Sequence, residues 1–330
     1  MKNKLTPTLC VLATSACLSV FSAISWGQAQ APRPPISELT IGAVHEYGCD
    51  STSEQPKLGL RALFHQVGGE WAAVCPSKRM GYTGPDDCAA SSLRGNVDWN
   101  TFKLDYDSGQ AVSSIGWLDL GGSLSAGLLE LRANDKLKLK DGLSSFGGWC
   151  SAEKTWKPLV VWRGRSAIER QTWSSSTPSK SDLSRVWPAL RKLVPKIPSC
   201  QFTDDGKPKG RARPTRVQDI EIHEKRTRKD GAALYRASVS ALLREECAEY
   251  GGFASDLWFF GANATTPLRS IVVQKLDDVW GYTLELVEFA DFDGNGRLGA
   301  LFWFSGYNED GFVLLTDNFR KQTKFTWGYH

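Results

Sequence analysis

The stretch TLELVEFADFDGNGRLGALFWF, residues 283–304, decides how this chain folds. Two runs rich in large apolar and aromatic residues, 283–289 and 298–304, stand on either side of a short segment rich in Asp, Asn and Gly. Short runs that are joined by a polar, Gly-rich turn are typical of antiparallel strands in a hairpin. The same pattern recurs along much of the chain, and we therefore expect a mainly β protein.

Short β-type runs are found both before and after residue 200. In the first part of the chain the expected strands are 58–66, 70–74, 102–106, 112–118, 128–131, 136–139 and 157–163. In the second part they are 220–225, 233–243, 257–261, 268–276, 283–289, 298–304, 311–315 and 324–329. Because most runs are followed by a polar turn, the sequence predicts antiparallel hairpins and meanders, arranged as propeller-like stacked sheets or as a sandwich.

One stretch has helical periodicity. From Asp182 to Val194, apolar residues recur three and four positions apart, which places them on one face of a helix. Ser181 can cap the first turn, and Pro195 cannot continue the helix. The sequence therefore predicts one amphipathic helix over residues 182–194.

Residues 197–216 are poor in apolar side chains and rich in Pro, Lys, Arg, Gly and Asp, as in a linker or long loop. We therefore expect an N-terminal β-rich half at 30–196 and a C-terminal β-meander at 217–330. The basic residues of this segment are interpreted as a solvated linker, because the formal charge of the whole chain is only +4. The same weak charge argues against nucleic acid as a partner.

Residues 1–29 have the features of a secretory signal peptide. Lys2 and Lys4 precede an apolar run at 9–24, and small residues follow up to Ala29. The run is shorter than the ~20 apolar residues that a membrane-spanning helix needs. We therefore expect a periplasmic or extracellular protein that is not inserted in the membrane after the signal is removed.

Six of the eight cysteines follow the predicted signal peptide, and none is part of a CxxC motif. An even number of cysteines in an oxidising compartment indicates structural disulfides, and the spacing does not favour a zinc or redox motif. The candidates are Cys49, Cys75, Cys88, Cys150, Cys200 and Cys247. Pairing of nearest neighbours would keep each bridge within one half of the chain, but the connectivity stays open. A reactive unpaired thiol is the functional alternative.

The segment from Asp291 to Arg297, DFDGNGR, carries the clearest sign of function. A hard cation such as Ca²⁺ needs several oxygen ligands that converge in a tight loop, and a glycine near the middle permits the turn. The side chains of Asp291, Asp293 and Asn295 and the carbonyl of Arg297 occupy suitable alternate positions, with Gly296 between the last two. The sequence therefore predicts a structural calcium site. The alternative is a plain polar hairpin turn, because Asp-Gly and Asn-Gly supply the positive φ that such turns require.

This segment resembles the DxDGDG calcium loops of FG-GAP and VCBS-type repeats, which join neighbouring strands in propeller blades of secreted and surface proteins. The β-type runs on both sides favour this resemblance over an EF-hand. The likeness covers about twenty residues, and it departs from the family at position 9, which is usually acidic and is Gly299 here. Position 12 is Phe302. The missing ligands would then come from Glu288, Glu309, Asp310 or water.

Motifs of known catalytic sites are almost absent. The sequence has no HExxH, no GxxxxGK[ST] and no GxSxG. An SxxK match at residues 151–154 is attributed to chance, because no KTG follows it. His45 with Asp98 or Asp119 is a candidate acid/base or metal set, although lone histidines on β runs are more often packed or surface residues.

Aromatic residues are dense after residue 257, and two interpretations are open. Exposed aromatic faces beside polar turns are typical of sugar-binding surfaces, whereas buried ones build a core. We expect a secreted or periplasmic binding or interaction module whose ligand is an unknown protein or glycan. The alternative is a secreted hydrolase that acts on cell-wall or polysaccharide material in a cleft between the two halves.

Overall fold

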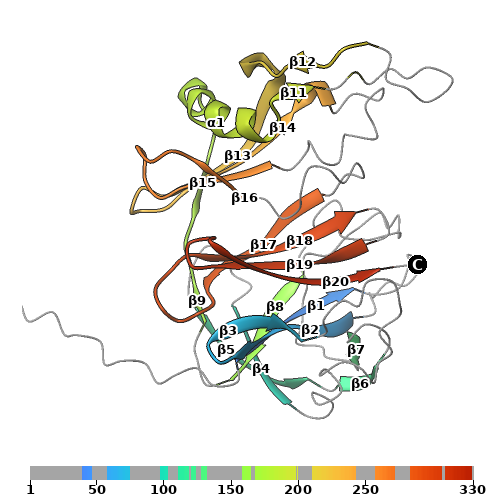
Figure 1. Ribbon diagram of the computed structural model, residues 1–330. Helices are drawn as coiled ribbons and strands as arrows, with labels where there is room; N and C mark the ends of the chain where they lie inside the picture. The colour runs from blue at the N-terminus through green and yellow to red at the C-terminus, as the bar shows by residue number, and fades with distance from the viewer. Residues whose placement is uncertain are drawn as a thin grey trace, which may run out of the picture. The chain divides into compact units, whose positions relative to one another are not determined.

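The computed structural model describes residues 39–46, 58–74, 97–102, 111–118, 120–123, 128–131, 158–164, 168–197, 199, 210–242, 257–271, 283–306 and 309–328. Within these ranges the chain is mainly β, with antiparallel sheets and one α-helix, as the sequence predicts (Figure 1). The sheets pack face to face in a sandwich-like manner. None of the described helices has the length and apolar character needed to cross a membrane.

The first sheet is built from strands in the first half of the chain. Its strands are β1 (Thr40–Glu46), β2 (Leu58–Val67), β3 (Glu70–Ala73), β4 (Val97–Phe102), β5 (Ala111–Leu118), β6 (Leu120–Ser123), β7 (Leu128–Leu131) and β8 (Leu159–Arg163). The order is β5-β4-β8-β1-β2-β7-β6, and β3 pairs with β2. The hairpin expected at 58–74 is confirmed, and it turns at Gly68 and Gly69 with φ of 61° and 84°.

One strand of this sheet begins earlier than the sequence predicts. The predicted strand is 102–106, whereas β4 covers Val97–Phe102, and residues 103–106 lie outside the described residues. In β4 the apolar residues alternate with Asp98 and Asn100, and Trp99 is fully buried. This alternation suits a strand but lacks the continuous apolar run by which the other strands are predicted. The strand expected at 136–139 lies outside the described residues.

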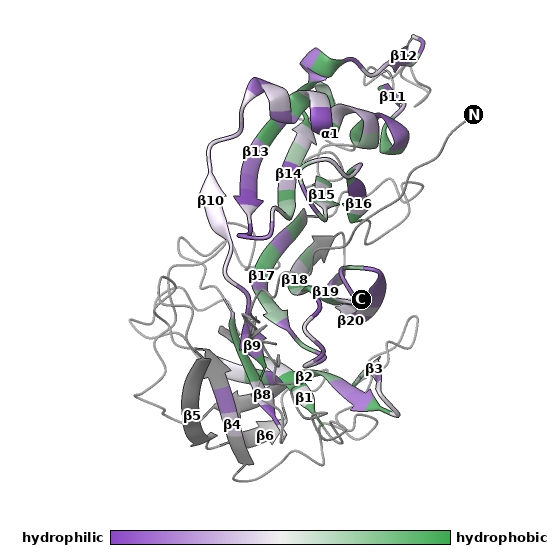
Figure 2. Ribbon diagram, turned by 90° about the vertical axis from the view of Figure 1, so that its left-hand side faces the viewer, coloured by the Kyte–Doolittle hydropathy of each residue, from purple (hydrophilic) through white to green (hydrophobic). Residues whose placement is uncertain are grey.

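The second sheet carries the helix. Its strands are β10 (Ser174–Ser176), β13 (Ile220–Thr227), β14 (Ala233–Val239), β15 (Leu257–Gly261) and β16 (Arg269–Ile271), in the order β10-β13-β14-β15-β16. Figure 2 shows β13 as largely hydrophilic beside a more hydrophobic β14. The helix α1 (Lys180–Leu193) buries Val186 and Leu190 in one core with Tyr235 and Phe259 of this sheet. This burial confirms the amphipathic helix.

Short elements lie next to the helix and this sheet. β11 (Lys196–Ile197), which pairs with β12 (Arg213–Pro214), and the 3-10 helix η3 (Val217–Asp219) come between α1 and β13, and the 3-10 helix η4 (Ser240–Leu242) follows β14. Residues 200–209 of the predicted linker lie outside the described residues. The domain boundary at 197–216 therefore stays a prediction.

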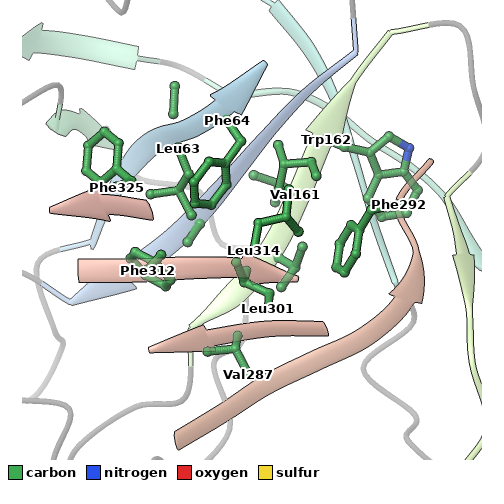
Figure 3. Close-up of a cluster of buried hydrophobic side chains, with 14 of the residues drawn as sticks. Leu63, Phe64, Val161, Trp162, Val287, Phe292, Leu301, Phe312, Leu314 and Phe325 are labelled. Atoms are coloured by element: carbon green, nitrogen blue, oxygen red, sulfur yellow. The ribbon is translucent and has the colours of Figure 1, made fainter. Parts of the chain in front are cut away.

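The third sheet is buried on both faces. Its strands are β9 (Glu169–Arg170), β17 (Thr283–Asp291), β18 (Gly299–Gly306), β19 (Glu309–Thr316) and β20 (Lys321–Gly328), in the order β20-β19-β18-β17-β9. Trp303 belongs to a core that includes residues of the first sheet, whereas Phe302 and Phe304 belong to one that includes residues of the second. Figure 3 shows the first of these cores, in which Phe64 from β2 lies near Phe325 from β20 at a ring-centroid distance of 6.5 Å. Core packing thus accounts for these aromatic side chains.

The helix begins two residues earlier than the sequence predicts. Ser179 is the N-cap instead of Ser181, and its backbone N–H donates to the carboxylate of Asp182 at 2.7 Å. Asp182 is buried, and the same carboxylate also accepts from Lys225 Nζ and from the Tyr235 hydroxyl, both at 2.8 Å. Asp182 is therefore both a capping residue and the polar link between the helix and the sheet.

We expect Asp182→Ala to lower the free energy of unfolding by about 2–3 kcal/mol, because the helix cap and two buried hydrogen bonds are lost together. Burial by itself would raise the pKa of Asp182, but hydrogen bonds from Lys225, Ser179 and Tyr235 hold it at about 2. A lowered pKa stabilises the fold above the ordinary carboxyl pKa, and this contribution disappears as the pH falls towards 2. Urea denaturation should therefore separate the variant from wild type at pH 7 and show a much smaller difference near pH 2. An equal difference at both pH values would contradict this role.

Candidate cation-binding loop

The predicted calcium segment forms the loop between β17 and β18. Ala290 and Gly299 face each other across the two strands and close the loop. Phe292 and Leu298, at the two ends of the turn, are 1% and 5% exposed and belong to different hydrophobic cores. The polar residues between them are therefore held by apolar anchors on both sides.

Asp291 lies inside this loop. Its side chain is buried, and its two oxygens accept hydrogen bonds from the backbone N–H groups of Asn295 at 3.1 Å and Gly296 at 2.6 Å. Gly294 and Gly296 have φ of 64° and 80°, a region that residues with a Cβ rarely adopt. The two glycines thus permit the turn that wraps the backbone around the Asp291 carboxylate.

Asp293 contributes the second carboxylate. Its Oδ1 accepts a hydrogen bond of 2.5 Å from the indole N–H of Trp71 in β3, and its Oδ2 accepts a longer one of 3.4 Å from Asn295 Nδ2. Burial raises the pKa of Asp293; the Trp71 hydrogen bond opposes this rise, and the negative charge of Asp291 adds to it. The negative charges of the two carboxylates repel each other, and a divalent cation between them would remove this repulsion.

The other two predicted ligands have partners in the loop and beside it. Asn295 Oδ1 accepts from the backbone N–H of Arg297 at 2.9 Å, and the Arg297 carbonyl accepts from Gln171 Nε2 at 2.9 Å. The Arg297 guanidinium forms an ion pair with Asp317 in the β19–β20 turn. Carbonyl and carboxylate oxygens have two lone pairs each, so these hydrogen bonds leave room for a cation. The four predicted residues therefore lie in one loop, and the calcium site stays a prediction.

The additional ligands suggested by the sequence are not available. Glu288 forms an ion pair of 2.6 Å with Arg170. Ala300 pairs with Leu315 beside the loop, whereas Asp310 pairs with Ser305 five positions further along β18, about 17 Å away at the usual rise of a strand. Glu309 lies beyond Asp310 at that far end. In the described parts of the chain, no group of three or more His, Cys, Asp or Glu side chains could hold a metal ion.

The missing acid at position 9 has a steric cause. A Cβ on Gly299 would lie 2.7 Å from the Ala290 carbonyl oxygen, 2.9 Å from Phe292 Cδ2 and 3.1 Å from the Leu315 carbonyl oxygen. Such distances are shorter than normal van der Waals contacts, and two of the three atoms belong to backbone. The close packing of β18 between β17 and β19 therefore leaves no space for a ligand side chain at this position.

A second loop of the same length lies between β15 and β16. Phe260 pairs with Arg269, so that residues 261–268 correspond in position to 291–298, and both loops show the same series of bends. In the second loop, Gly261 stands in the place of Asp291. The charged groups inside the two loops can therefore be compared position by position.

The second loop receives a positive charge from the protein itself. The guanidinium of Arg185 in α1 donates to the backbone carbonyls of Asn263 and Thr266. A Cβ on Gly261 would lie 2.6 Å from Arg185 Nη2, so the guanidinium occupies the space that the Asp291 side chain takes in the first loop. Among the described residues, no Lys or Arg forms an ion pair with Asp291 or Asp293. The nearby Lys321 is paired with Glu70 at 2.6 Å.

Two of the other candidate site residues, His45 and Asp98, are not brought together. His45 in β1 and Asp98 in β4 lie on strands that are separated by β8. Ile41 and Asn100 both pair with Trp162, which places Asp98 and His45 about six residues apart along the strands, on the order of 20 Å. Asp119 and all six disulfide candidates lie outside the described residues.

A Ser-His-Glu arrangement on β13 and β14 was not expected from the sequence. His223 Nε2 lies 2.7 Å from Ser238 Oγ, and His223 Nδ1 lies 3.8 Å from a Glu221 carboxylate oxygen. The second distance is too long for a hydrogen bond, and Ser238 has no exposed surface. A nucleophile must reach its substrate, so this arrangement is a contact between neighbouring strands and does not form a catalytic triad.

A scan against protein-family models and searches of curated proteins and of solved structures find no match for this chain.

Proposed function

We propose that the chain is a secreted or periplasmic interaction module in which the loop 291–297 binds one calcium ion for a structural purpose. The observation that supports this proposal is the charge of the two matching loops. The loop 261–268 has the guanidinium of Arg185 at its centre, whereas the loop 291–298 has the carboxylates of Asp291 and Asp293. A divalent cation would supply the positive charge that these carboxylates lack.

In this proposal each loop residue has a defined task. Asp291 and Asp293 hold the cation through their carboxylates, and Asn295 Oδ1 and the Arg297 carbonyl complete the protein ligands, with water at the remaining positions. Trp71 and Gln171 orient Asp293 and Arg297 by hydrogen bonds from outside the loop. The cation would fix the β17–β18 hairpin and its position against β3.

Several acidic side chains support an interaction module over a hydrolase, because they are already bound to basic partners. Asp219 accepts two hydrogen bonds from Arg213, at 2.7 and 2.8 Å. Asp182 is paired with Lys225, and Glu288 with Arg170. Carboxylates that are neutralised in this way stabilise the fold and are not free to transfer protons.

Calcium should raise the thermal stability of the protein. At 10 mM calcium and with a dissociation constant of about 10⁻⁴–10⁻³ M, which is typical of extracellular modules, the added stability is about 1.4–2.7 kcal/mol. Thermal melts with calcium and with chelator measure this difference. Asp293→Asn removes one charge from the loop and should remove most of the calcium effect.

Asp230→Asn is the matched control, because Asp230 is an exposed acid of the β13–β14 turn that is paired with Arg228. This variant should keep the full calcium effect. Equal melting temperatures with calcium and with chelator in wild type would show that the loop 291–297 is a plain hairpin turn.

A further inference from the structure

A pocket of about 330 Å³ lies beside the two matching loops. Residues of the loops 261–268 and 291–298 line it, together with residues of the β13–β14 turn and of the β19–β20 turn. Three of its lining residues are arginines, Arg228, Arg269 and Arg320. The proposed function leaves this pocket without a role.

Two of the three arginines give the pocket a net positive charge. Arg228 is neutralised by Asp230, to which its Nε donates at 3.1 Å. Arg269 and Arg320 form no ion pair with a carboxylate in the described residues, and Asp317 is already paired with Arg297. Burial lowers the pKa of Arg269, the charge of the neighbouring Arg320 lowers it further, and the charge of Asp317 opposes the shift.

Arg269 is held in a fixed position. Its guanidinium donates to the Asn318 carbonyl, and its Cζ lies 5.8 Å from the centroid of the Phe260 ring. Asn318 is fixed in turn by Leu298 of the candidate calcium loop: Asn318 N–H donates to the Leu298 carbonyl at 2.9 Å, and Leu298 N–H donates to Asn318 Oδ1 at 3.1 Å. A positioned guanidinium loses little freedom when it binds an anion.

The turn that carries Asn318 has an unusual backbone. Asp317, Asn318 and Phe319 have φ of 52°, 55° and 62°, although none of them is glycine. Asp and Asn tolerate left-handed backbone, but it costs roughly 1–2 kcal/mol for a residue such as Phe319, and strain of this kind is concentrated at functional sites. Phe319 is buried and anchors the turn, so the strained conformation is maintained beside the pocket.

We propose that this pocket binds the carboxylate of an acidic side chain on a partner protein, a role that rests on the proposed interaction function. Guanidinium groups match a carboxylate in shape and charge. Phe260, Pro267 and Leu298 also line the pocket and suit the aliphatic stem of such a side chain. Among the described residues, the exposed large hydrophobic side chains are Val67 and Val217, so no exposed aromatic platform favours a sugar ring instead.

The test is an NMR titration of the protein with N-acetyl-glutamate α-amide, which carries one carboxylate on an aliphatic stem. N-acetyl-glutamine α-amide is the neutral control probe, and inorganic phosphate is the third probe. We expect the glutamate probe to bind in the millimolar range and to shift the amide signals of Leu298, Asn318 and Arg320. Arg320→Gln should weaken this binding about tenfold, because one charge-assisted hydrogen bond is lost.

Arg211→Gln is the matched control, because Arg211 is an exposed arginine that does not line the pocket; it should bind the probe as wild type does. Equal binding of the neutral probe, equal binding by Arg320→Gln, or no saturable shift would overturn the proposal. Tighter binding of phosphate at the same residues would replace the carboxylate by a phosphate ligand. A failed titration together with an intact calcium effect on melting would reject the pocket and leave the proposed function standing.

Discussion

Asp310→Ala should lower the free energy of unfolding by about 3–5 kcal/mol, because it removes the negative charge beside a buried arginine. Asp310 in β19 is 1% exposed and Arg61 in β2 is 3% exposed. Burial lowers the pKa of Arg61 to about 9, while the charge of Asp310 acts in the opposite direction. The Arg61 guanidinium also lies over the Trp327 ring, at 3.9 Å from the centroid. The electrostatic attraction between these two buried charges acts between the first and third sheets.

Two further variants test whether the loss of stability comes from the buried charge of Arg61. The double variant Arg61→Met with Asp310→Leu should recover most of the loss, because apolar side chains of similar size often replace a buried ion pair without cost. Asp230→Ala breaks the exposed pair with Arg228 and should cost ~1 kcal/mol or less. Urea denaturation measures all three variants. A loss for Asp310→Ala no greater than that for Asp230→Ala would contradict the buried contact.

Gly299→Ala should lower the free energy of unfolding by about 2–3 kcal/mol, because the added methyl group has no space between two strands. Two of the three atoms that it would meet are backbone oxygens, of Ala290 and Leu315, which cannot move without disturbing the sheet. Gly69→Ala is the control, since Gly69 has a φ of 84° but no atom within 4 Å of an added Cβ. That control should cost roughly 1 kcal/mol from its backbone conformation alone. Equal losses in urea denaturation would mean that β18 is not closely packed at Gly299.

Local sequence patterns were sufficient for most of the described fold. The run 283–304 and the hairpin 58–74 carry their own turns, so strand and turn can be predicted from adjacent residues. The helix start was missed although Ser179 and Asp182 form a local capping box, because Ser181 offered a competing N-cap. The contacts of Asp182 with Lys225 and Tyr235 could not be predicted, because these residues lie more than forty residues away in the sequence. Residues 97–101 of β4 were not predicted as strand, because their apolar residues alternate with polar ones.

The residues of the candidate site likewise come partly from one short segment and partly from distant parts of the sequence. Asp291, Asp293 and Asn295 are close in sequence, and the loop indeed places them together. Trp71 and Gln171 reach the loop from distant parts of the chain, so no local pattern identifies them. The correspondence of the two loops depends on strand register and on the position of Arg185, which are properties of the folded chain.

The measurement that tests the central claim most directly is a calorimetric titration of the protein with calcium. We expect one site per chain with a dissociation constant of about 10⁻⁴–10⁻³ M, and we expect Asp291→Asn and Asp293→Asn each to abolish the binding heat. Asp230→Asn should bind calcium as wild type does. Absence of saturable binding in wild type, or unchanged binding in Asp293→Asn, would contradict the assignment of the loop 291–297 as a calcium site.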